Sequence, residues 1–138
     1  MDESLRRTAE NVIGYRFSNP ELLARALTHA STAGTRLDSN ERLEFLGDAV
    51  LGLVVCEMIY RRFPQYLEGE MTKVKSLVVS RTTCAQIASR LGLERLLMLG
   101  KGMQTNAPLP ASLGAAAFES VIGALYLSAV CILPELLI

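Results

Sequence analysis

The sequence has 138 residues, and its 14 Lys and Arg against 14 Asp and Glu give a formal net charge of zero. This balance argues against a protein that binds nucleic acid mainly through a large uniform positive field, although it allows a local basic face beside a local acidic one. Half of the residues are hydrophobic and 20% are charged, which excludes intrinsic disorder and fits one compact domain.

The first part of the chain predicts two helices followed by a loop. Apolar residues recur at helical spacing over 5–13, and Gly14 follows as a typical helix end. Pro20 marks the first turn of a second helix, which continues over 21–30. Residues 31–40 are almost entirely polar or turn-forming, and they predict a loop.

A long helix is predicted in the middle of the chain. It begins near Asp38 or Asn40 and runs to about Tyr60, with Pro64 closing the region. Its interior is apolar on nearly every face, so we expect this helix to be central and buried.

Two shorter helices follow in the sequence. The first covers about 69–80. Thr83 and Gln86 have the spacing of a capping box for the second, which covers 84–91 and ends at Gly92.

The last part of the chain predicts a loop over 101–112 and a strongly apolar helix over about 113–130. Glu119 is the only charged residue between positions 113 and 134, so the segment approaches the composition of a membrane span. Its Ser, Ala and Gly residues and the lack of flanking Lys or Arg favour a buried central helix instead. No strand-length stretch alternates with period 2, so the predicted fold class is all-α.

The three cysteines, Cys56, Cys84 and Cys131, are widely spaced, and the chain has a single His. This pattern fits neither a disulfide scaffold nor a zinc site, so we expect reduced, mostly buried thiols. The N-terminal residues 1–14 contain no apolar stretch of signal type, which predicts a cytoplasmic protein without membrane association.

Four carboxylates stand out because they occur in apolar surroundings. Glu41, Glu44 and Asp48 have i, i+3, i+7 spacing, which puts them on one face of the long helix, and Glu119 stands alone in the last helix. Buried acids are costly unless a cation or hydrogen-bond donors compensate them, so we expect the two helices to form facing walls of one site. Oxygen-only ligands favour Mg²⁺ or Mn²⁺, which commonly support phosphoryl-transfer hydrolysis.

Each acid also has a purely structural alternative. Glu41 could complete a capping box begun at Asp38. Glu44 and Asp48 could form ion pairs with a nearby basic side chain, and Glu119 could lie on an exposed helix rim. If all of these alternatives held, the acids of the long helix and Glu119 of the last helix would each need a separate explanation, whereas one shared site explains both.

Residues 40–51, NERLEFLGDAVL, closely resemble the signature of the ribonuclease III family. Supporting matches are LTHAS at 27–31, EGEMTK at 68–73 and AFESVIGALYL at 117–127. These segments occur in order over nearly the whole chain, which is therefore identified as a member of the family.

The resemblance implies a compact helical endonuclease domain over residues 1–138 that acts as a homodimer on double-stranded RNA. Its hydrolysis would depend on Mg²⁺, with Mn²⁺ as a substitute, and would leave 5′-phosphate and 3′-hydroxyl ends. The sequence stops soon after the last predicted helix, so we expect no separate double-stranded-RNA-binding domain in this chain.

The resemblance also assigns roles to individual acids. Glu44, Asp48 and Glu119 fall on metal-binding positions, and the implied catalytic residues are Asp48, Glu119, Glu41 and Glu68. Asp48 matches the acid assigned to catalysis and metal organisation, whereas Glu41 and Glu68 match acids that line the cleavage valley of the dimer.

The chain departs from the family pattern at Ala116. The family has Asp three residues before the glutamate that corresponds to Glu119, so the metal shell lacks one expected carboxylate. Losing an anionic ligand weakens the binding of a hard cation. The resulting hypothesis is an attenuated nuclease, and the alternative is a catalytically inactive relative that binds structured RNA as a dimer.

The candidate RNA contacts are Lys73, Lys75, Arg81 and Lys101, which lie in the half of the chain where acids are sparse. Their spacing forms no dense patch, so a solvated helix face is an equally good interpretation. His29 is interpreted as a packed or capping group rather than a catalytic one.

Overall fold

The structure is a computed structural model that describes residues 1–104 and 108–129. Over these ranges the chain forms helices and one isolated β-bridge, between Thr28 and Met98, which confirms the all-α fold class. The α-helices are α1 (Glu3–Ile13), α2 (Pro20–Ala26), α3 (Glu41–Arg62), α4 (Glu68–Val78), α5 (Arg81–Leu91) and α6 (Ala111–Ala129). The short 3₁₀ helices are η1 (Arg36–Asp38), η2 (Leu93–Leu96) and η3 (Lys101–Met103).

The first two helices begin at capping residues. The side chain of Asp2 caps α1 by accepting a hydrogen bond from the Leu5 amide at 2.7 Å, and Gly14 ends the helix at φ 78°. The helix α2 is shorter than the predicted 21–30. The residues after Ala26 leave the helix because their backbone pairs with Met98. The Met98 amide donates to the Leu27 carbonyl at 2.8 Å, and the Met98 carbonyl accepts from the His29 amide at 3.1 Å.

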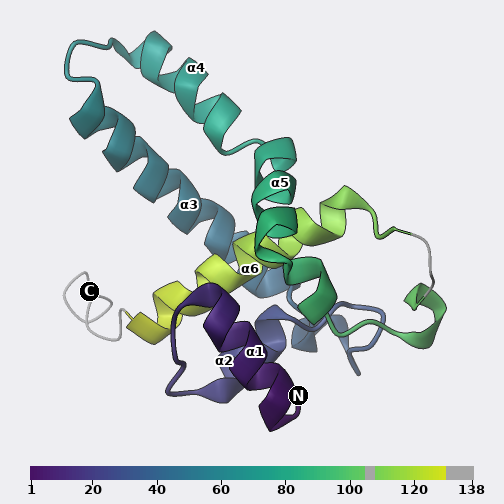
Figure 1. The fold of residues 1–138 in the computed structure, drawn as a ribbon. Helices are drawn as coiled ribbons and strands as arrows, with labels where there is room; N and C mark the ends of the chain where they lie inside the picture. The colour runs from purple at the N-terminus through teal and green to yellow at the C-terminus, as the bar shows by residue number, and fades with distance from the viewer. Residues whose placement is uncertain (105–107, 130–138) are drawn as a thin grey trace.

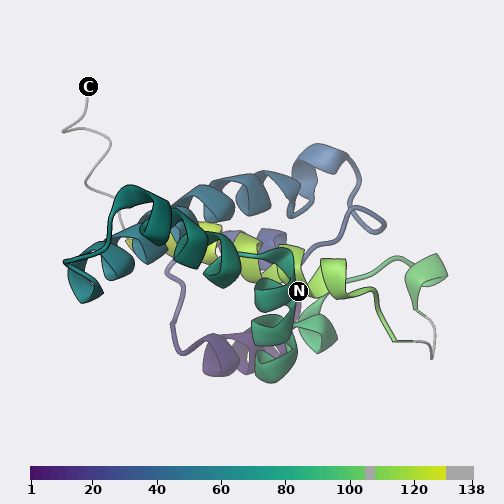
Figure 2. The same cartoon turned by 90° about the horizontal axis from the view of Figure 1, so that it is seen from above.

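The helix α6 lies at the centre of the fold, as predicted. It packs most extensively against α3 and α5, and two perpendicular views show it crossing the middle of the molecule (Figures 1 and 2). By length and hydropathy α6 would suffice to cross a membrane, yet 44% of that window is buried inside the fold. The first helical residue is Ala111 rather than 113, and the predicted end at 130 lies outside the described residues.

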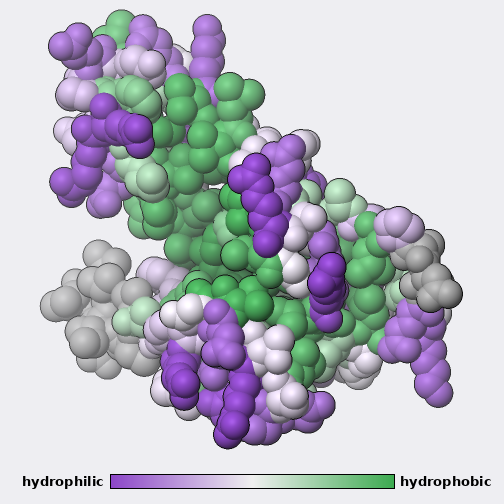
Figure 3. All heavy atoms as spheres, in the orientation of Figure 1, coloured by the Kyte–Doolittle hydropathy of each residue, from purple (hydrophilic) through white to green (hydrophobic). Residues whose placement is uncertain are grey.

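The helix α3 has the predicted boundaries but not the predicted burial. Only Leu43, Gly47, Val55 and Ile59 are buried along it, whereas Phe45 is 83% exposed. The expectation of a fully buried helix is wrong because α6 and α4 cover only part of its circumference. Figure 3 shows hydrophobic residues along the arm that α3 forms with α4.

The helices α3 and α4 form an antiparallel arm that extends from the body of the molecule (Figure 1). The rings of Phe63 and Tyr66 stack at a centroid distance of 4.6 Å in the turn between them. The helix α4 has no buried residue, so much of its apolar surface is open to solvent.

The cysteines differ in their environment. Cys84 is buried, and burial together with the charges of Glu119 and Asp48 raises the pKa of its thiol. Cys56 lines a cavity between α3 and α4 and is exposed, which corrects the expectation of a buried thiol. Cys131 lies outside the described residues.

The helix α5 begins at a different cap from the predicted one. The Ser80 hydroxyl accepts a hydrogen bond from the Thr83 amide at 3.1 Å, so Ser80 is the N-cap and the capping box of Thr83 and Gln86 is not formed. Gly92 ends the helix at φ 73°, as predicted.

A buried carboxylate fixes the connection between α1 and α2. Glu10 accepts hydrogen bonds from the Phe17 amide at 2.9 Å and from Arg6 Nε at 3.4 Å. These contacts, led by the Phe17 amide, hold the pKa of Glu10 below its ordinary value of 4.5. A lowered folded-state pKa adds stability above the ordinary value, and this stability is lost as the pH falls through the folded-state value.

We therefore expect Glu10→Gln to lower the melting temperature at neutral pH and to lower it less at about pH 3, because the stability contributed by the wild-type carboxylate declines as the pH falls below its ordinary pKa. Thermal unfolding followed by circular dichroism measures both. The control is Glu3→Gln on the same helix, because Glu3 is an exposed acid with surface ion pairs. A melting difference that stays the same at both pH values would contradict the assigned role of the carboxylate.

Candidate functional site

The acids singled out by the sequence line one cleft. The cleft has a volume of about 620 Å³, and its walls come from α3, α6 and the start of α5. Its lining residues are Glu41, Glu44, Phe45, Asp48, Val79, Arg81 and Glu119. The predicted stripe on α3 and its position opposite Glu119 of α6 are both present.

The carboxylates differ in their access to solvent. Glu119 is 8% exposed and Glu44 is partly buried, but Asp48 is exposed and the Glu41 side chain is 41% exposed. The expectation that all four are buried is therefore wrong for the α3 acids. They line the open side of the cleft, while Glu119 comes from the central helix.

The surroundings of Glu119 disfavour its negatively charged form. Burial raises the pKa of Glu119, and the nearby carboxylates of Asp48 and Glu44 raise it further, while Arg81 acts in the opposite direction. The cleft therefore disfavours an additional negative charge and favours a proton or a cation.

Arg81 is the basic side chain among the cleft residues. Its Nη2 donates to Glu44 Oε1 at 3.4 Å, so the ion-pair alternative for Glu44 is realised. The guanidinium is 57% exposed, and such a pair contributes less than about 1 kcal/mol. One weakly held guanidinium does not neutralise the three carboxylates of Glu44, Asp48 and Glu119.

A loop residue holds Glu41 at the edge of the cleft. Arg36 donates to both carboxylate oxygens, at 2.7 and 3.2 Å, and this pair lowers the pKa of Glu41. The capping-box alternative is not formed, because Asp38 accepts from Thr35 at 3.0 Å and the Glu41 amide donates to Ser39 at 3.3 Å. Sequence reasoning missed Arg36, because the geometry of the loop brings it to Glu41.

The chemistry of the cleft residues fits a hard divalent cation. The acidic side chains offer only carboxylate oxygens as metal ligands, and the negative charge of the buried Glu119 is repelled by Asp48 and Glu44. In the described part of the chain, no three His, Cys, Asp or Glu side chains lie close enough to hold an ion as they stand. Glu44 lies toward Arg81, and the charges of Asp48 and Glu44 repel that of Glu119.

The two acidic helices cross at their glycines. A Cβ atom on Gly47 would overlap the backbone carbonyl of Glu119, and one on Gly123 would overlap the carbonyl of Leu43. The two backbones are therefore in direct contact, which places Glu119 opposite the α3 acids. The close crossing at Gly47 and Gly123 was not predicted from the sequence, although a glycine inside each of two apolar helices indicates close backbone contact.

Ala116 lies one helical turn before Glu119 and is partly exposed. Residues three apart share a face of an α-helix, so the carboxylate expected at position 116 would lie beside that of Glu119. Ala116 is not among the residues that line the cleft.

The remaining candidates lie elsewhere in the single chain. Glu68 and Lys75 line a separate cavity of about 240 Å³ between α3 and α4, and Lys73 is exposed on α4. Lys101 belongs to η3, at the opposite side of the molecule from α4 (Figure 1). The four basic residues therefore do not form one patch.

His29 has a structural role in the chain, as expected. Its Nδ1 lies 2.8 Å from the Ser31 hydroxyl, and that hydroxyl oxygen accepts a hydrogen bond from the Gly100 amide at 2.8 Å. These contacts hold the loop after α2 against the segment before η3.

Comparison with known proteins identifies a consistent set of relatives. The family described as Ribonuclease-III-like has a model that matches residues 19–131. Ribonuclease 3 of Rhodopirellula baltica is 52% identical over 118 residues, which cover 86% of this chain and 44% of that protein. Ribonuclease 3 of Bdellovibrio bacteriovorus is 44% identical over 126 residues, covering 88% of this chain and 54% of that protein. The chain thus spans about half the length of these curated relatives.

Solved structures agree with this assignment. A structure of the nuclease domain of Ribonuclease III from Campylobacter jejuni, which addresses flexibility in a region involved in dimer formation, has a TM-score of 0.82 and 36% identity. The match covers 88% of this chain and 85% of that one. Dicer from Pichia stipitis matches with a TM-score of 0.62 and 32% identity, over 86% of this chain and 50% of that one.

Proposed function

Because this chain belongs to the ribonuclease-III-like family, we propose that it is an endoribonuclease domain that cleaves double-stranded RNA by metal-dependent hydrolysis. The products would carry 5′-phosphate and 3′-hydroxyl ends. The observation that carries the proposal is the cleft in which the acids of α3 face the buried Glu119 of α6. Such a cleft provides oxygen ligands beside a surface that is open to a polymeric substrate.

The residues that would hold Mg²⁺, or Mn²⁺ in its place, are Glu44, Asp48 and Glu119. When bound, such an ion lowers the pKa of a coordinated water and stabilises the charge on the leaving oxygen. The chain's own contribution is to orient these carboxylates through the close crossing of α3 and α6. Glu41, held by Arg36, is positioned to orient water or substrate at the edge of the cleft.

A homodimer is part of the proposal. The open apolar side chains of the α3–α4 arm need a partner surface, and Glu68 on the same arm lies outside the cleft of its own chain. The exposed apolar residues of this arm include Phe45, Leu53, Met58, Leu67 and Leu77. A second copy that packs on the arm would bury them and form the joint valley in which Glu68, Lys73 and Lys75 serve the substrate. Lys101 is proposed as a more distant RNA contact.

Ala116 supports attenuation of this activity. A shell with one fewer carboxylate binds a hard cation less tightly and leaves more of its positions to water. The second candidate function is binding of structured RNA without cleavage. It is favoured by Ala116, which leaves the cleft one carboxylate short of the family pattern.

The proposal is tested by incubating the purified chain with a duplex RNA in Mn²⁺ and in a chelator. We expect slow cleavage of the duplex in Mn²⁺, little cleavage of the separated strands, and 5′-phosphate ends on the products. Glu119→Gln should reduce cleavage to the level of a sample without protein. Because the raised pKa of Glu119 means that its charge destabilises the fold at neutral pH, the same variant should melt no lower than the parent chain.

Glu21→Gln, which changes an exposed acid of α2 outside the cleft, is the control and should cleave like the parent. Cleavage that survives Glu119→Gln would contradict the proposal, because it would come from another site or from a contaminant. Metal-independent binding of the duplex without any cleavage would favour the second candidate.

A further inference from the structure

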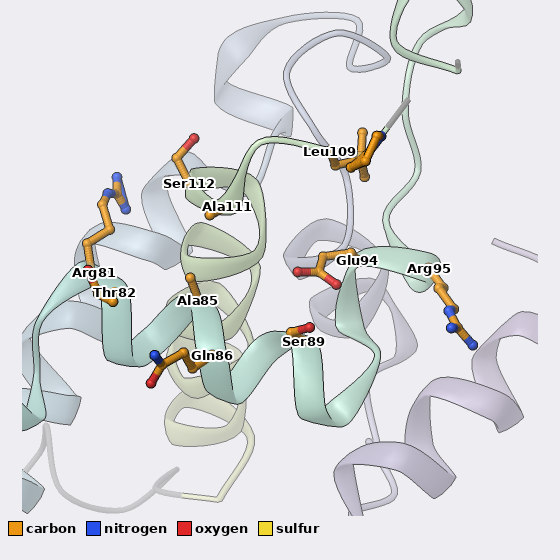
Figure 4. A pocket seen from close by; sticks show the side chains of 11 residues that line it. Arg81, Thr82, Ala85, Gln86, Ser89, Glu94, Arg95, Leu109, Ala111 and Ser112 are labelled. Atoms are coloured by element: carbon orange, nitrogen blue, oxygen red, sulfur yellow. The ribbon is translucent and has the colours of Figure 1, made fainter. Parts of the chain in front are cut away.

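Arg81, the first residue of α5, lies between two hollows of the molecule. It lines the acidic cleft, and it also lines a cavity of about 910 Å³ beside α5 and the start of α6 (Figure 4). Figure 4 shows its side chain at the end of this cavity that is opposite to Glu94 and Arg95. Because the guanidinium is largely exposed, little packing opposes its movement from the cleft toward the cavity.

The contact between Arg81 and Glu44 is weaker than the other arginine–glutamate contact at the cleft. Arg81 Nη2 donates to Glu44 Oε1 at 3.4 Å. Arg36, in contrast, donates to both carboxylate oxygens of Glu41, at 2.7 and 3.2 Å. A bidentate pair between arginine and a carboxylate is stronger than one long hydrogen bond. Of these two acids, Glu44 is therefore the one that its arginine releases more easily.

The charge of Arg81 acts on the other acids of the cleft as well. Burial raises the pKa of Glu119, Asp48 and Glu44 raise it further, and Arg81 lowers it. Arg81 thus partly balances the carboxylates that a divalent cation would balance more fully. A guanidinium and a divalent cation beside the same carboxylate repel each other, so each weakens the binding of the other.

We propose that Arg81 competes with a divalent cation for the carboxylate of Glu44. The guanidinium holds this carboxylate when no metal is bound, and it turns toward the cavity beside α5 when the cleft takes up the ion. Arg81 is therefore a positioning residue, because it acts through the proposed metal ligand Glu44. The inference rests on the proposed metal-dependent function. It makes the metal concentration at which the cleft fills depend on a side chain that is not itself a ligand.

The test measures the binding of Mn²⁺ by the purified chain and by two variants, without RNA. The electron paramagnetic resonance signal of the free ion gives the affinity. We expect Arg81→Gln to bind Mn²⁺ about fivefold more tightly, which corresponds to about 1 kcal/mol, the upper range for an exposed ion pair. The matched control is Arg42→Gln. Arg42 is exposed and only two positions from Glu44, but it leaves α3 on another side and does not line the cleft. This control should bind Mn²⁺ within about twofold of the parent, because solvent and salt screen an exposed charge that makes no contact with the site.

Melting temperatures of the three proteins with and without Mn²⁺, and cleavage of duplex RNA, are measured in parallel. Mn²⁺ should raise the melting temperature of Arg81→Gln more than that of the parent. Equal or weaker binding of Mn²⁺ by Arg81→Gln would overturn the competition even if the chain cleaves the duplex, and so would an equal gain in Arg42→Gln. Tighter binding by Arg81→Gln alone would support it even if no duplex is cleaved, in which case the nuclease proposal fails separately.

Discussion

Replacing Gly47 by Ala should destabilise the fold by about 3 kcal/mol or more, because overpacking against a rigid neighbour is among the most costly single substitutions. The added methyl group would overlap the backbone carbonyl of Glu119, and a backbone cannot move aside as a flexible side chain can. The α3–α6 crossing would have to open. Any remaining folded protein would have Glu119 displaced from the acids of α3.

Urea unfolding followed by circular dichroism measures this loss. The matched control is Gly52→Ala on the same helix, where the new methyl group would meet only the end of the Lys75 side chain at 3.9 Å. Because alanine is the better helix former, this control should gain about 0.5–1 kcal/mol. If both variants had the same stability, the close crossing of α3 and α6 would be wrong.

Replacing Ala116 by Asp should increase cleavage of duplex RNA about 100-fold, which corresponds to about 2.7 kcal/mol of transition-state stabilisation. The new carboxylate would lie one helical turn from Glu119 and would restore the acid that the family pattern contains. Without metal the variant should melt lower than the parent, because it adds a negative charge near Glu119, whose own charge is already disfavoured by burial and by nearby carboxylates. Mn²⁺ should therefore raise its melting temperature more than that of the parent.

Ala116→Asn is the control for this gain. Its side chain has nearly the same size and helix propensity as Asp but adds no charge. It should leave cleavage near the parent level and show no additional stabilisation by Mn²⁺. An equal gain from Asn would mean that side-chain shape rather than the anionic ligand is responsible.

The helix boundaries that depend on local chemistry were predictable from the sequence. Gly14 and Gly92 end their helices with positive φ, as their positions indicated. The early end of α2 was not predictable, because it depends on pairing with Met98, which is distant in the sequence. The capping box of Thr83 was wrong because Ser80, three residues earlier, caps the same helix.

The composition of the acidic cleft was predictable, but its electrostatics were not. Spacing placed Glu41, Glu44 and Asp48 on one face, and an isolated acid in an apolar helix indicated the opposite wall. Periodicity could not show that Arg36 holds Glu41 or that Arg81 reaches Glu44, because these contacts depend on the paths of loops.

The burial of α3 was overestimated for an informative reason. A helix that is apolar on nearly every side is ordinarily enclosed by its own domain. Here the described chain leaves side chains such as Phe45 and Met58 open to solvent. Apolar periodicity does not distinguish a face that is covered within one chain from a face that stays open to solvent.

The most direct test of the account is the rate of duplex RNA cleavage by this chain and by Ala116→Asp over a series of Mg²⁺ and Mn²⁺ concentrations. We expect the parent chain to cleave weakly, to require a high metal concentration and to be more active in Mn²⁺, because Mg²⁺ demands near-ideal octahedral geometry. Ala116→Asp should reach its maximal rate at much lower concentrations of either ion. Rapid cleavage by the parent at low Mg²⁺, with no gain from Ala116→Asp, would contradict the proposal that Ala116 weakens the metal site.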